Sequence, residues 1–331
     1  MNWSSAGVLF ICVFAASLAA TRGVLAIVQR HAILDLPNER SSHTVPTPKG
    51  GGIAVVAILI PVWYWLAAPA GGQAALVLSA AAGGLALLSW VDDLKDIQAS
   101  WRLLGQAVAV SLVFALAPPP PLFGGALPPT VDLLVAGVLW LWFINVFNFM
   151  DGIDGLAASE TITIGAGITL LAAVAGLGWV LAAQGLAAAA AGLGFLWWNR
   201  PPARIFMGDV GSVTLGFLLG WLLLEVARSG LGAAALILPL YFLADATVTL
   251  IRRALRLQPV WRAHREHFYQ RAIDAGASHG NVVTKVLFVN FLLIGLAALA
   301  AKGLAVWAIG GAALLVGFLL RRLGRKPTVA P

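Results

Sequence analysis

Three aspartates follow a long apolar stretch of the chain, at Asp92, Asp93 and Asp96. Adjacent carboxylates repel one another, and Asp92 and Asp96 are about one helical turn apart, so a divalent cation or the counter-ion of a bound phosphate would stabilise the group. The alternative is a solvated loop whose charges end the apolar stretch, because paired aspartates are common.

The segment 145–155 combines amide, acidic and glycine residues in a more specific pattern. Asn145, Asn148 and Asp151 recur every three residues, which predicts a slanted polar stripe at the end of a helix. The two glycines that follow let the backbone approach a ligand closely. Oxygen ligands of this kind suit Mg²⁺ or Mn²⁺, and the same groups could hold a nucleobase or a ribose. Helix capping by asparagine and aspartate is the structural alternative.

Three other segments could bind phosphate. Asp209 lies between two glycines at the expected start of a helix, where backbone N–H groups meet anions and the carboxylate can bind a metal or merely cap the helix. Segment 264–271 holds two histidines and two arginines, suited to a pyrophosphate, to a lipid surface or, given a third ligand, to zinc. Segment 35–52 ends in a lysine and three glycines and predicts a phosphate-approaching loop or a rigid linker.

The elements that must position these segments are membrane helices. The chain has 331 residues, of which 60% are hydrophobic and 11% charged, so a water-soluble protein is excluded. With about 20 apolar residues per crossing, we predict one all-α polytopic transmembrane bundle of about 10–11 spans, formed by residues 1–331 as a single domain. The spans lie near 6–29, 51–68, 74–91, 102–117, 131–147, 159–176, 178–197, 211–228, 232–250, 282–301 and 303–320.

Basic residues set the predicted orientation of the bundle. Nearly all lysines and arginines fall in alternate loops, which makes that side cytoplasmic and places the N-terminus outside and the C-terminus inside. The net charge of +7 therefore indicates membrane orientation and not nucleic-acid binding, and the single cysteine, Cys12, excludes an intrachain disulfide. Every polar segment described above lies on the basic side. We thus expect an active site at the cytoplasmic face of a bacterial inner membrane, built from loops 30–50, 92–101, 148–158, 198–210 and 251–281.

Taken together, the five segments resemble the polyprenyl-phosphate N-acetylhexosamine-1-phosphate transferases of glycosyltransferase family 4. The similarity covers nearly the whole chain in the same order. The motifs are DxPNxRSxHxxPxPKGGG at 35–52, VDDxxD at 91–96, NxxNxxDGIDGLA at 145–157, PAxIFMGDxGS at 202–212 and HRxHxYQRA at 264–272.

The resemblance implies a role for each matching residue. Asp209 is expected as the principal Mg²⁺ ligand, with Mn²⁺ as an alternative ion, and Asn148 as its companion. Asp92, Asp93 and Asp209 form the implied catalytic group, with Asp92 as the base if one is needed. The implied nucleotide-sugar ligands are Asn145, Asp151, Asp154, Asn199 and Phe206, and the implied phosphate ligands are Lys49, His264, Arg265, His267 and Arg271.

The implied reaction transfers a GlcNAc, FucNAc or QuiNAc type of sugar-1-phosphate from a UDP-N-acetylhexosamine to undecaprenyl phosphate and releases UMP. The last motif resembles the branch that initiates O-antigen synthesis and lacks the triple histidine of peptidoglycan translocases, so a phospho-MurNAc-pentapeptide transferase is the alternative within the family. A cation-coupled transporter or a lipid-linked-sugar flippase is the rival from another class, and an assembly scaffold is a third. A transporter should carry ionisable groups in mid-span, where we find little beyond Arg22. A homodimer is compatible with this interpretation.

Overall fold

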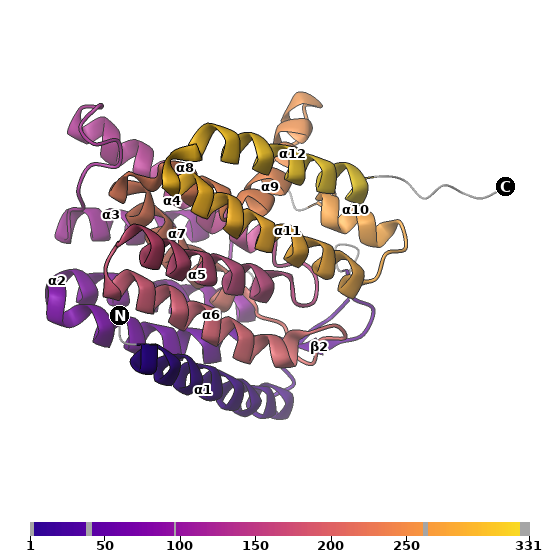
Figure 1. Ribbon diagram of the computed structural model, residues 1–331. Coiled ribbons are helices and arrows are strands. Elements are labelled where there is room, and N and C mark those ends of the chain that lie inside the picture. The colour runs from indigo at the N-terminus through magenta and orange to yellow at the C-terminus, as the bar shows by residue number, and fades with distance from the viewer. Residues whose placement is uncertain (1–2, 38–41, 96, 261–263, 325–331) are drawn as a thin grey trace.

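The computed structural model describes residues 3–37, 42–95, 97–260 and 264–324, and this part of the chain is a helical bundle. Most of the long helices run side by side, with their connections gathered at the two ends (Figure 1). Eight helical stretches within the described residues are long and apolar enough to cross a membrane. The predicted all-α polytopic membrane bundle is therefore confirmed.

The elements follow one another without a large interruption. The first half of the chain forms α1 (Trp3–Arg30), α2 (Gly52–Lys95), α3 (Ala99–Leu116), α4 (Pro129–Phe149), α5 (Leu156–Ala175) and α6 (Trp179–Asn199). The second half forms α7 (Asp209–Val226), α8 (Gly232–Ile237), α9 (Leu240–Leu255), α10 (Phe268–Asp274), α11 (His279–Leu299) and α12 (Ala305–Leu323), with short π-helical segments η1 (Ala227–Leu231) and η2 (Ala300–Leu304). Strands β1 (Leu34–Asp35) and β2 (Thr47–Pro48) pair antiparallel between α1 and α2.

Helix α2 contains two membrane crossings. Its 44 residues would extend about 66 Å if straight, roughly twice the apolar thickness of a bilayer. The helical backbone is interrupted at Gly71. Gly52 at its start donates to the Met207 carbonyl (2.8 Å), and Asp93 near its end accepts from the Asp209 amide (3.1 Å). Because both ends of α2 meet the start of α7, the helix turns back on itself, as the two spans predicted at 51–68 and 74–91 require.

The C-terminal helices complete the predicted spans. Helices α11 and α12 reverse at Gly303, whose positive φ of 93° favours glycine. The break near Pro239 divides the span predicted at 232–250 into α8 and α9. With α2 taken as two segments and α8 with α9 as one, the described residues contain eleven apolar segments in the predicted order. The sequence did not predict α10 or the small β1–β2 pair.

Small residues let α6 approach its two neighbours closely. A Cβ on Gly165 would lie 2.5 Å from the Gly185 carbonyl oxygen, so α5 and α6 are in near-backbone contact. On the other side, Ser17 of α1 donates to the Ala191 carbonyl at 2.7 Å. Such small-residue contacts drive helix association in lipid, where hydrophobicity gives no preference for protein over acyl chains. The alanine-rich composition of α6 is thus a packing feature.

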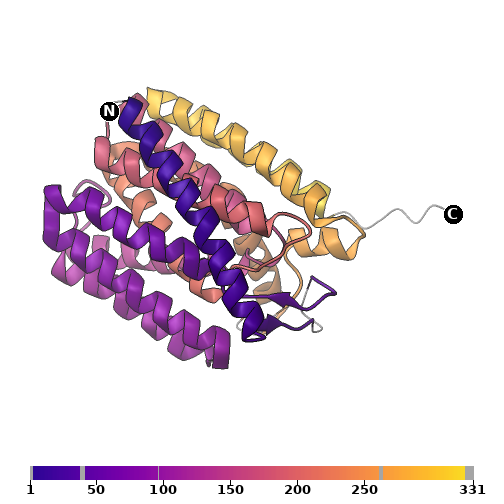
Figure 2. The same cartoon turned by 90° about the horizontal axis from the view of Figure 1, so that it is seen from below.

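The connections at one end of the bundle form what we call the site end. This end carries the β1–β2 segment, the end of α2, the α4–α5 turn, the α6–α7 connection and α10, as the two views in Figures 1 and 2 show. Helix α1 begins at the opposite end and finishes near β1. Helix α12 finishes at the site end, where Gly324 accepts from Arg271 at 3.1 Å.

Candidate functional site

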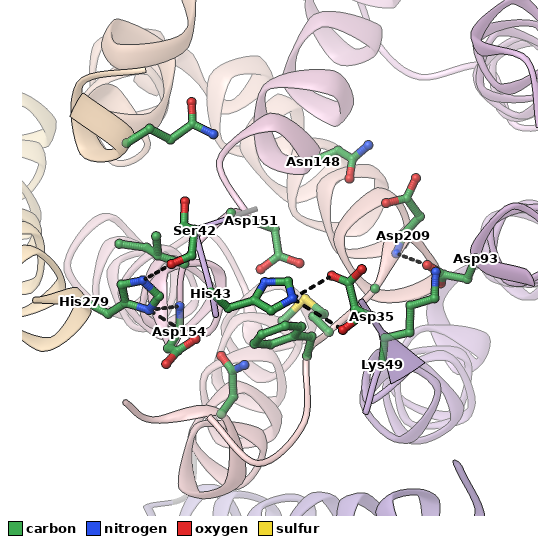
Figure 3. A pocket seen from close by; sticks show the side chains of 17 residues that line it. Asp35, Ser42, His43, Lys49, Asp93, Asn148, Asp151, Asp154, Asp209 and His279 are labelled. Carbon is green, nitrogen blue, oxygen red and sulfur yellow. Dashed lines mark hydrogen bonds and ion pairs between the residues drawn. The ribbon is translucent and has the colours of Figure 1, made fainter. Parts of the chain in front are cut away.

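A cavity of about 350 Å³ lies at the site end, and segments that are distant in sequence line it (Figure 3). We call it the central cavity. The residues lining it that the sequence predicted are Lys49, Asp93, Asn148, Asp151, Asp154, Asn199, Phe206 and Asp209. The predicted residues outside its lining are Asp92, Asn145, His264, Arg265, His267 and Arg271. The cavity thus joins four of the five predicted segments through predicted residues and takes Gln270 from the fifth.

Asp93 caps the helix that carries Asp209. Its two carboxylate oxygens accept from the backbone amides of Asp209 and Val210, each at 3.1 Å, at the positive end of α7. A Cβ on Gly208, whose φ is +76°, would lie 2.8 Å from the Asp93 carboxylate. Glycine is therefore required there by both backbone conformation and space. The Gly-Asp-x-Gly pattern thus places Asp209 at a helix start where the carboxylate of Asp93, from the end of α2, also lies.

Asp92 holds this arrangement from outside the cavity. Its carboxylate is buried and accepts from the Ile97 amide (2.6 Å) and from the Arg102 guanidinium (2.9 Å). The same Nη1 of Arg102 reaches an Asp209 oxygen at 3.1 Å. Asp92 therefore positions Arg102, and through it Asp209. Of the two adjacent aspartates, Asp93 is the one that lines the cavity.

The predicted stripe of 145–151 divides at the helix end. Asn148 lines the cavity, and Ser212 of α7 donates to its side-chain oxygen at 2.7 Å. Asn145 lies one turn deeper, where its amide donates to Gln106 (2.7 Å) and to the Leu141 carbonyl (2.8 Å). Asn145 thus joins α4 to α3. Helix α4 ends at Phe149, so Asp151 reaches the cavity from the following turn.

The acidic side chains fit a divalent cation bound together with substrate phosphates. Burial, and the negative charges of Asp209 and Asp93, raise the pKa of Asp151 well above its usual range. This repulsion is what a cation would relieve. In the described part of the chain no three His, Cys, Asp or Glu side chains converge to enclose a metal. Mg²⁺ commonly takes one or two carboxylates and completes its shell with water and phosphate oxygens, which the donors Asp209, Asn148 and Asp151 can accommodate.

The α4–α5 turn is held against the α6–α7 connection by two predicted residues. Asn199 accepts from the Gly155 amide and donates to the Ile205 carbonyl, both at 2.9 Å. Asp154 accepts from the Ala203 amide at 3.0 Å and pairs with His279 Nδ1 at 3.2 Å. Both side chains line the cavity, and both also brace its wall.

The α1–α2 connection supplies more of the cavity than the sequence indicated. Besides Lys49, which lies beside Asp93 in Figure 3, it contributes Asp35, Ser42 and His43. His43 Nε2 lies 3.9 Å from the Asp35 carboxylate, and its ring meets the edge of Phe206 with 4.8 Å between centroids. The motif residues 38–41 and Asp96 lie outside the described residues. The sequence contained a signal for this part of the cavity, because His43 follows Asp35 within the same motif.

The backbone of this connection is joined to the segment before Asp209. Phe206 donates to the Pro48 carbonyl (2.8 Å), and Gly51 donates to the Phe206 carbonyl (2.9 Å). A Cβ on Gly52 would lie 2.2 Å from the Gly211 Cα, so the glycines after Lys49 allow close backbone contact. These glycines pack against the segment 206–211 of the protein, and this contact holds Lys49 beside Asp93.

Segment 264–271 is anchored by Asp245, a residue to which the sequence gave no role. The Asp245 carboxylate is fully buried and accepts from the amides of Phe268 (2.9 Å) and Tyr269 (3.2 Å). His267 Nδ1 lies 3.3 Å from the same carboxylate. This anchor turns Gln270 toward the central cavity and leaves His267 buried. His279, at the start of α11, lines the cavity instead, as His43 does.

The remaining predicted cations of this segment lie elsewhere. Arg265 pairs with Asp274 at 2.7 Å, and Arg271 donates to the Gly324 carbonyl. Burial and the positive charges of His267 and Arg253 lower the pKa of His264 to about 4. His264 is therefore neutral near pH 7, which differs from the cationic cluster that the sequence predicted.

A polytopic helical bundle with an acidic cavity at one end defines an integral membrane protein whose candidate site lies at the end of its membrane-crossing helices. Comparison with known proteins agrees with this class. The model of the family described as Glycosyl transferase family 4 matches residues 75–227, which include Asp93, Asn148, Asp151 and Asp209.

Similar proteins extend the match over most of the chain. The probable undecaprenyl-phosphate N-acetylglucosaminyl 1-phosphate transferase of Bacillus subtilis is 27% identical, over 90% of this chain and 86% of the relative. The decaprenyl-phosphate N-acetylglucosaminephosphotransferase of Mycobacterium tuberculosis is 28% identical, over 91% and 86%. Its namesake in Mycolicibacterium smegmatis is 28% identical, over 90% and 82%. The chain is thus similar to glycosyl transferase family 4 over residues 75–227, and to polyprenyl-phosphate N-acetylglucosamine-1-phosphate transferases over most of its length.

Proposed function

We propose that the protein transfers an N-acetylhexosamine-1-phosphate from a UDP-sugar to a polyprenyl phosphate, releases UMP and leaves a lipid-linked diphospho-sugar. The observation that carries this proposal is the convergence of Asp93, Asn148, Asp151, Asp209 and Lys49 on one cavity at the end of a membrane bundle. The names of the similar proteins, which act on undecaprenyl or decaprenyl phosphate, support the same reaction class.

In the proposed step an oxygen of the lipid phosphate attacks the β-phosphorus of the UDP-sugar. The new P–O bond replaces the bond between the β-phosphorus and the oxygen that leaves with UMP, so one pyrophosphate linkage is exchanged for another. A phosphate monoester has its second pKa near 6, so the attacking group is already largely dianionic at pH 7 and needs no strong base. The main obstacle is repulsion between two anions, and the protein must reduce it.

Charged groups of the cavity meet this requirement. Mg²⁺, or Mn²⁺ in its place, would be held by Asp209 and Asn148, with Asp151 nearby, and would supply positive charge to the diphosphate. Lys49 adds a fixed positive charge beside Asp93. His43 and His279 lie on the part of the cavity that remains for the nucleotide and sugar, with Phe206 as a flat apolar surface. Asp93 is the member of the adjacent aspartate pair that lines the cavity in which the lipid phosphate would react.

We infer that the site end faces the cytoplasm of a bacterial inner membrane. Lysine and arginine concentrate in the segments of this end, as the positive-inside rule requires for cytoplasmic loops. Helix α1 begins at the opposite end and α12 finishes at the site end, which agrees with an outside N-terminus and an inside C-terminus. A nucleotide donor is available on that side.

We further propose that the sugar is an N-acetylhexosamine of the GlcNAc, FucNAc or QuiNAc type, and that the product initiates an O-antigen or related polysaccharide. The HRxHxYQR sequence at 264–271 supports this branch, and the N-acetylglucosamine named in the three relatives supports GlcNAc among the sugars. A panel of radiolabelled UDP-sugars with undecaprenyl phosphate would identify the donor.

The decisive experiment measures UMP release by the purified protein from UDP-GlcNAc and undecaprenyl phosphate, with and without EDTA. We expect release that depends on both substrates, stops on chelation and returns with Mg²⁺. A transporter or flippase would move its substrate across sealed vesicles and release no UMP, and a scaffold would do neither. Absence of UMP with every UDP-sugar of the panel would contradict the proposal.

A further inference from the structure

A second cavity, of about 210 Å³, lies at the site end of α9 and shares no lining residue with the central cavity. We call it the arginine cavity. Its lining consists of Thr249, Arg252, Arg256, Glu266 and Arg271. Three of the five side chains are guanidinium groups. The proposed reaction uses none of these residues.

The arginine cavity carries an excess of positive charge. Its one carboxylate, Glu266, forms ion pairs with Arg253 and, at 3.6 Å, with Arg256. Arg252 and Arg271 have no carboxylate partner among the described residues, and their guanidinium carbons lie 4.8 and 5.8 Å from the centre of the Phe268 ring. Arginine forks recognise phosphate oxygens in pairs, so this surplus suits a phosphate group.

Thr249 gives a second and independent indication of a ligand. This residue lines the cavity and is only 3% exposed, and its buried hydroxyl has no hydrogen-bond partner among the described residues. A buried hydroxyl without a partner costs free energy, and most such groups in proteins are satisfied. A phosphate oxygen in the cavity would accept from this hydroxyl.

The surroundings of the arginine cavity indicate a lipid. Helix α9 projects from the bundle in Figure 1, across the direction of most other helices. Beside the arginines it exposes Ile251 and Leu255, and the turn that follows exposes Leu257; their exposed fractions are 53%, 80% and 94%. An apolar face next to arginines at the membrane boundary is typical of contact with acyl chains and anionic headgroups together.

We propose that the arginine cavity binds the phosphate of an anionic phospholipid headgroup, with the acyl chains lying along Ile251 and Leu255. The phosphodiester accepts from Arg252, Arg256 and the Thr249 hydroxyl. Inorganic phosphate offers the same oxygens but no acyl chain, and is the other source that the experiment must separate.

The test is lipid binding to the full-length protein in neutral detergent, measured by native mass spectrometry with phosphatidylglycerol or phosphatidylcholine. The wild type should retain one phosphatidylglycerol in preference to phosphatidylcholine. Each basic residue near an anionic headgroup contributes roughly fivefold in affinity, so Arg252→Gln with Arg256→Gln should weaken binding roughly 30-fold. Thr249→Val keeps the shape of the side chain, removes the hydroxyl and should weaken binding about fivefold.

The matched control is Arg321→Gln with Arg322→Gln, which removes two charges from the last turn of α12 without touching the lining. This control should bind phosphatidylglycerol like the wild type, and thermal unfolding should show that all variants are folded. An equal loss in the control, or no preference for phosphatidylglycerol, would overturn the proposal. If millimolar inorganic phosphate displaced the lipid completely, the cavity would be a site for free phosphate and the lipid assignment would fail.

Discussion

Asp209 and Asp92 differ in what they touch, although the sequence places both in the catalytic group. Asp209 lines the central cavity, whereas Asp92 is buried and holds Arg102. We therefore expect Asp209→Ala to lower kcat by about two to three orders of magnitude, the usual cost of losing a group that stabilises transition-state charge. Asp92→Asn keeps an acceptor for the Ile97 amide and should cost about tenfold or less, through a displaced Arg102.

UMP release by the two purified variants, at saturating and limiting Mg²⁺, measures this difference. Arg102→Gln is the companion variant, because it removes the contact through which Asp92 acts and should resemble Asp92→Asn. A larger loss for Asp92→Asn than for Asp209→Ala would reverse the two roles.

His264 makes the protein sensitive to acid. Its pKa of about 4 in the folded protein lies below the ordinary 6.5, so the unfolded chain binds the proton first. Stability is therefore lost as the pH falls from about 6.5 to about 4 and is unaffected by this group above that range. His264 is half-buried, and screening by solvent reduces the effect to about 1 kcal/mol.

The variant His264→Gln should flatten this part of the stability profile. Thermal unfolding of both proteins between pH 7 and pH 4 is the measurement, and the two Tm values should converge at the higher pH. A difference between the two proteins that does not change with pH would show that the imidazole acts by packing alone.

At the scale of the helices, the start of α7 requires a glycine at position 208 both for its backbone conformation and for the space beside it. Gly208 and Gly176 both have positive φ, +76° and +71°, but only at Gly208 would a Cβ meet another group, the Asp93 carboxylate. Gly208→Ala should therefore displace Asp93 and lower activity about a hundredfold. Gly176→Ala should cost about 1 kcal/mol of stability, as alanine in the left-handed region does, and leave turnover intact. Tm of the two variants reports the backbone strain that both share. UMP release reports the displacement of the Asp93 carboxylate, which only Gly208→Ala should cause.

The anchor of α10 on α9 is a second prediction at this scale. Asp245→Ala removes the acceptor for the Phe268 and Tyr269 amides, each such charged hydrogen bond being worth about 1.5–3 kcal/mol. Hydrogen exchange of residues 266–274 should accelerate, and KM should rise because Gln270 loses its place at the cavity. Asp245→Asn keeps one acceptor oxygen, so its exchange rate and its KM should lie between those of the wild type and those of Asp245→Ala. Unchanged exchange in Asp245→Ala would show that α10 is held by other contacts.

These helices also show which cavity residues could be predicted from the sequence and which could not. Residues at segment ends, such as Asp93, Asn148 and Asp209, were found because charged groups can follow an apolar span only at the membrane boundary, where all segments of one side meet. Asn145 lies outside the cavity lining, because its three-residue spacing from Asn148 also fits contact with Gln106 one turn deeper. Segment 264–271 gives Gln270 to the cavity lining instead of its predicted cations, because its orientation depends on Asp245, which lies 23 residues before Phe268 and within a helix.

At the scale of the whole molecule, the fold explains how a chain with many membrane-crossing helices builds the central cavity. Each hairpin of helices returns the chain to the site end, so α2, α4 with α5, and α6 with α7 each deliver a short polar segment there. Within the bundle, the buried Glu160 of α5 accepts from Asn290 of α11 at 2.6 Å, which joins two of the crossings.

Sidedness is the property of the whole molecule on which the proposed reaction depends. In a chain made free of cysteine by Cys12→Ser, single cysteines at Thr44 and Ser278 should react with a membrane-impermeant maleimide only when inverted vesicles expose the cytoplasmic face, since both side chains are exposed at the site end. A cysteine at Ala126, exposed in the α3–α4 connection, should react only from the outer face. Labelling of Thr44→Cys and Ser278→Cys from opposite faces would separate the two walls of the central cavity by a bilayer, and a joint site for nucleotide and lipid phosphate could not then exist.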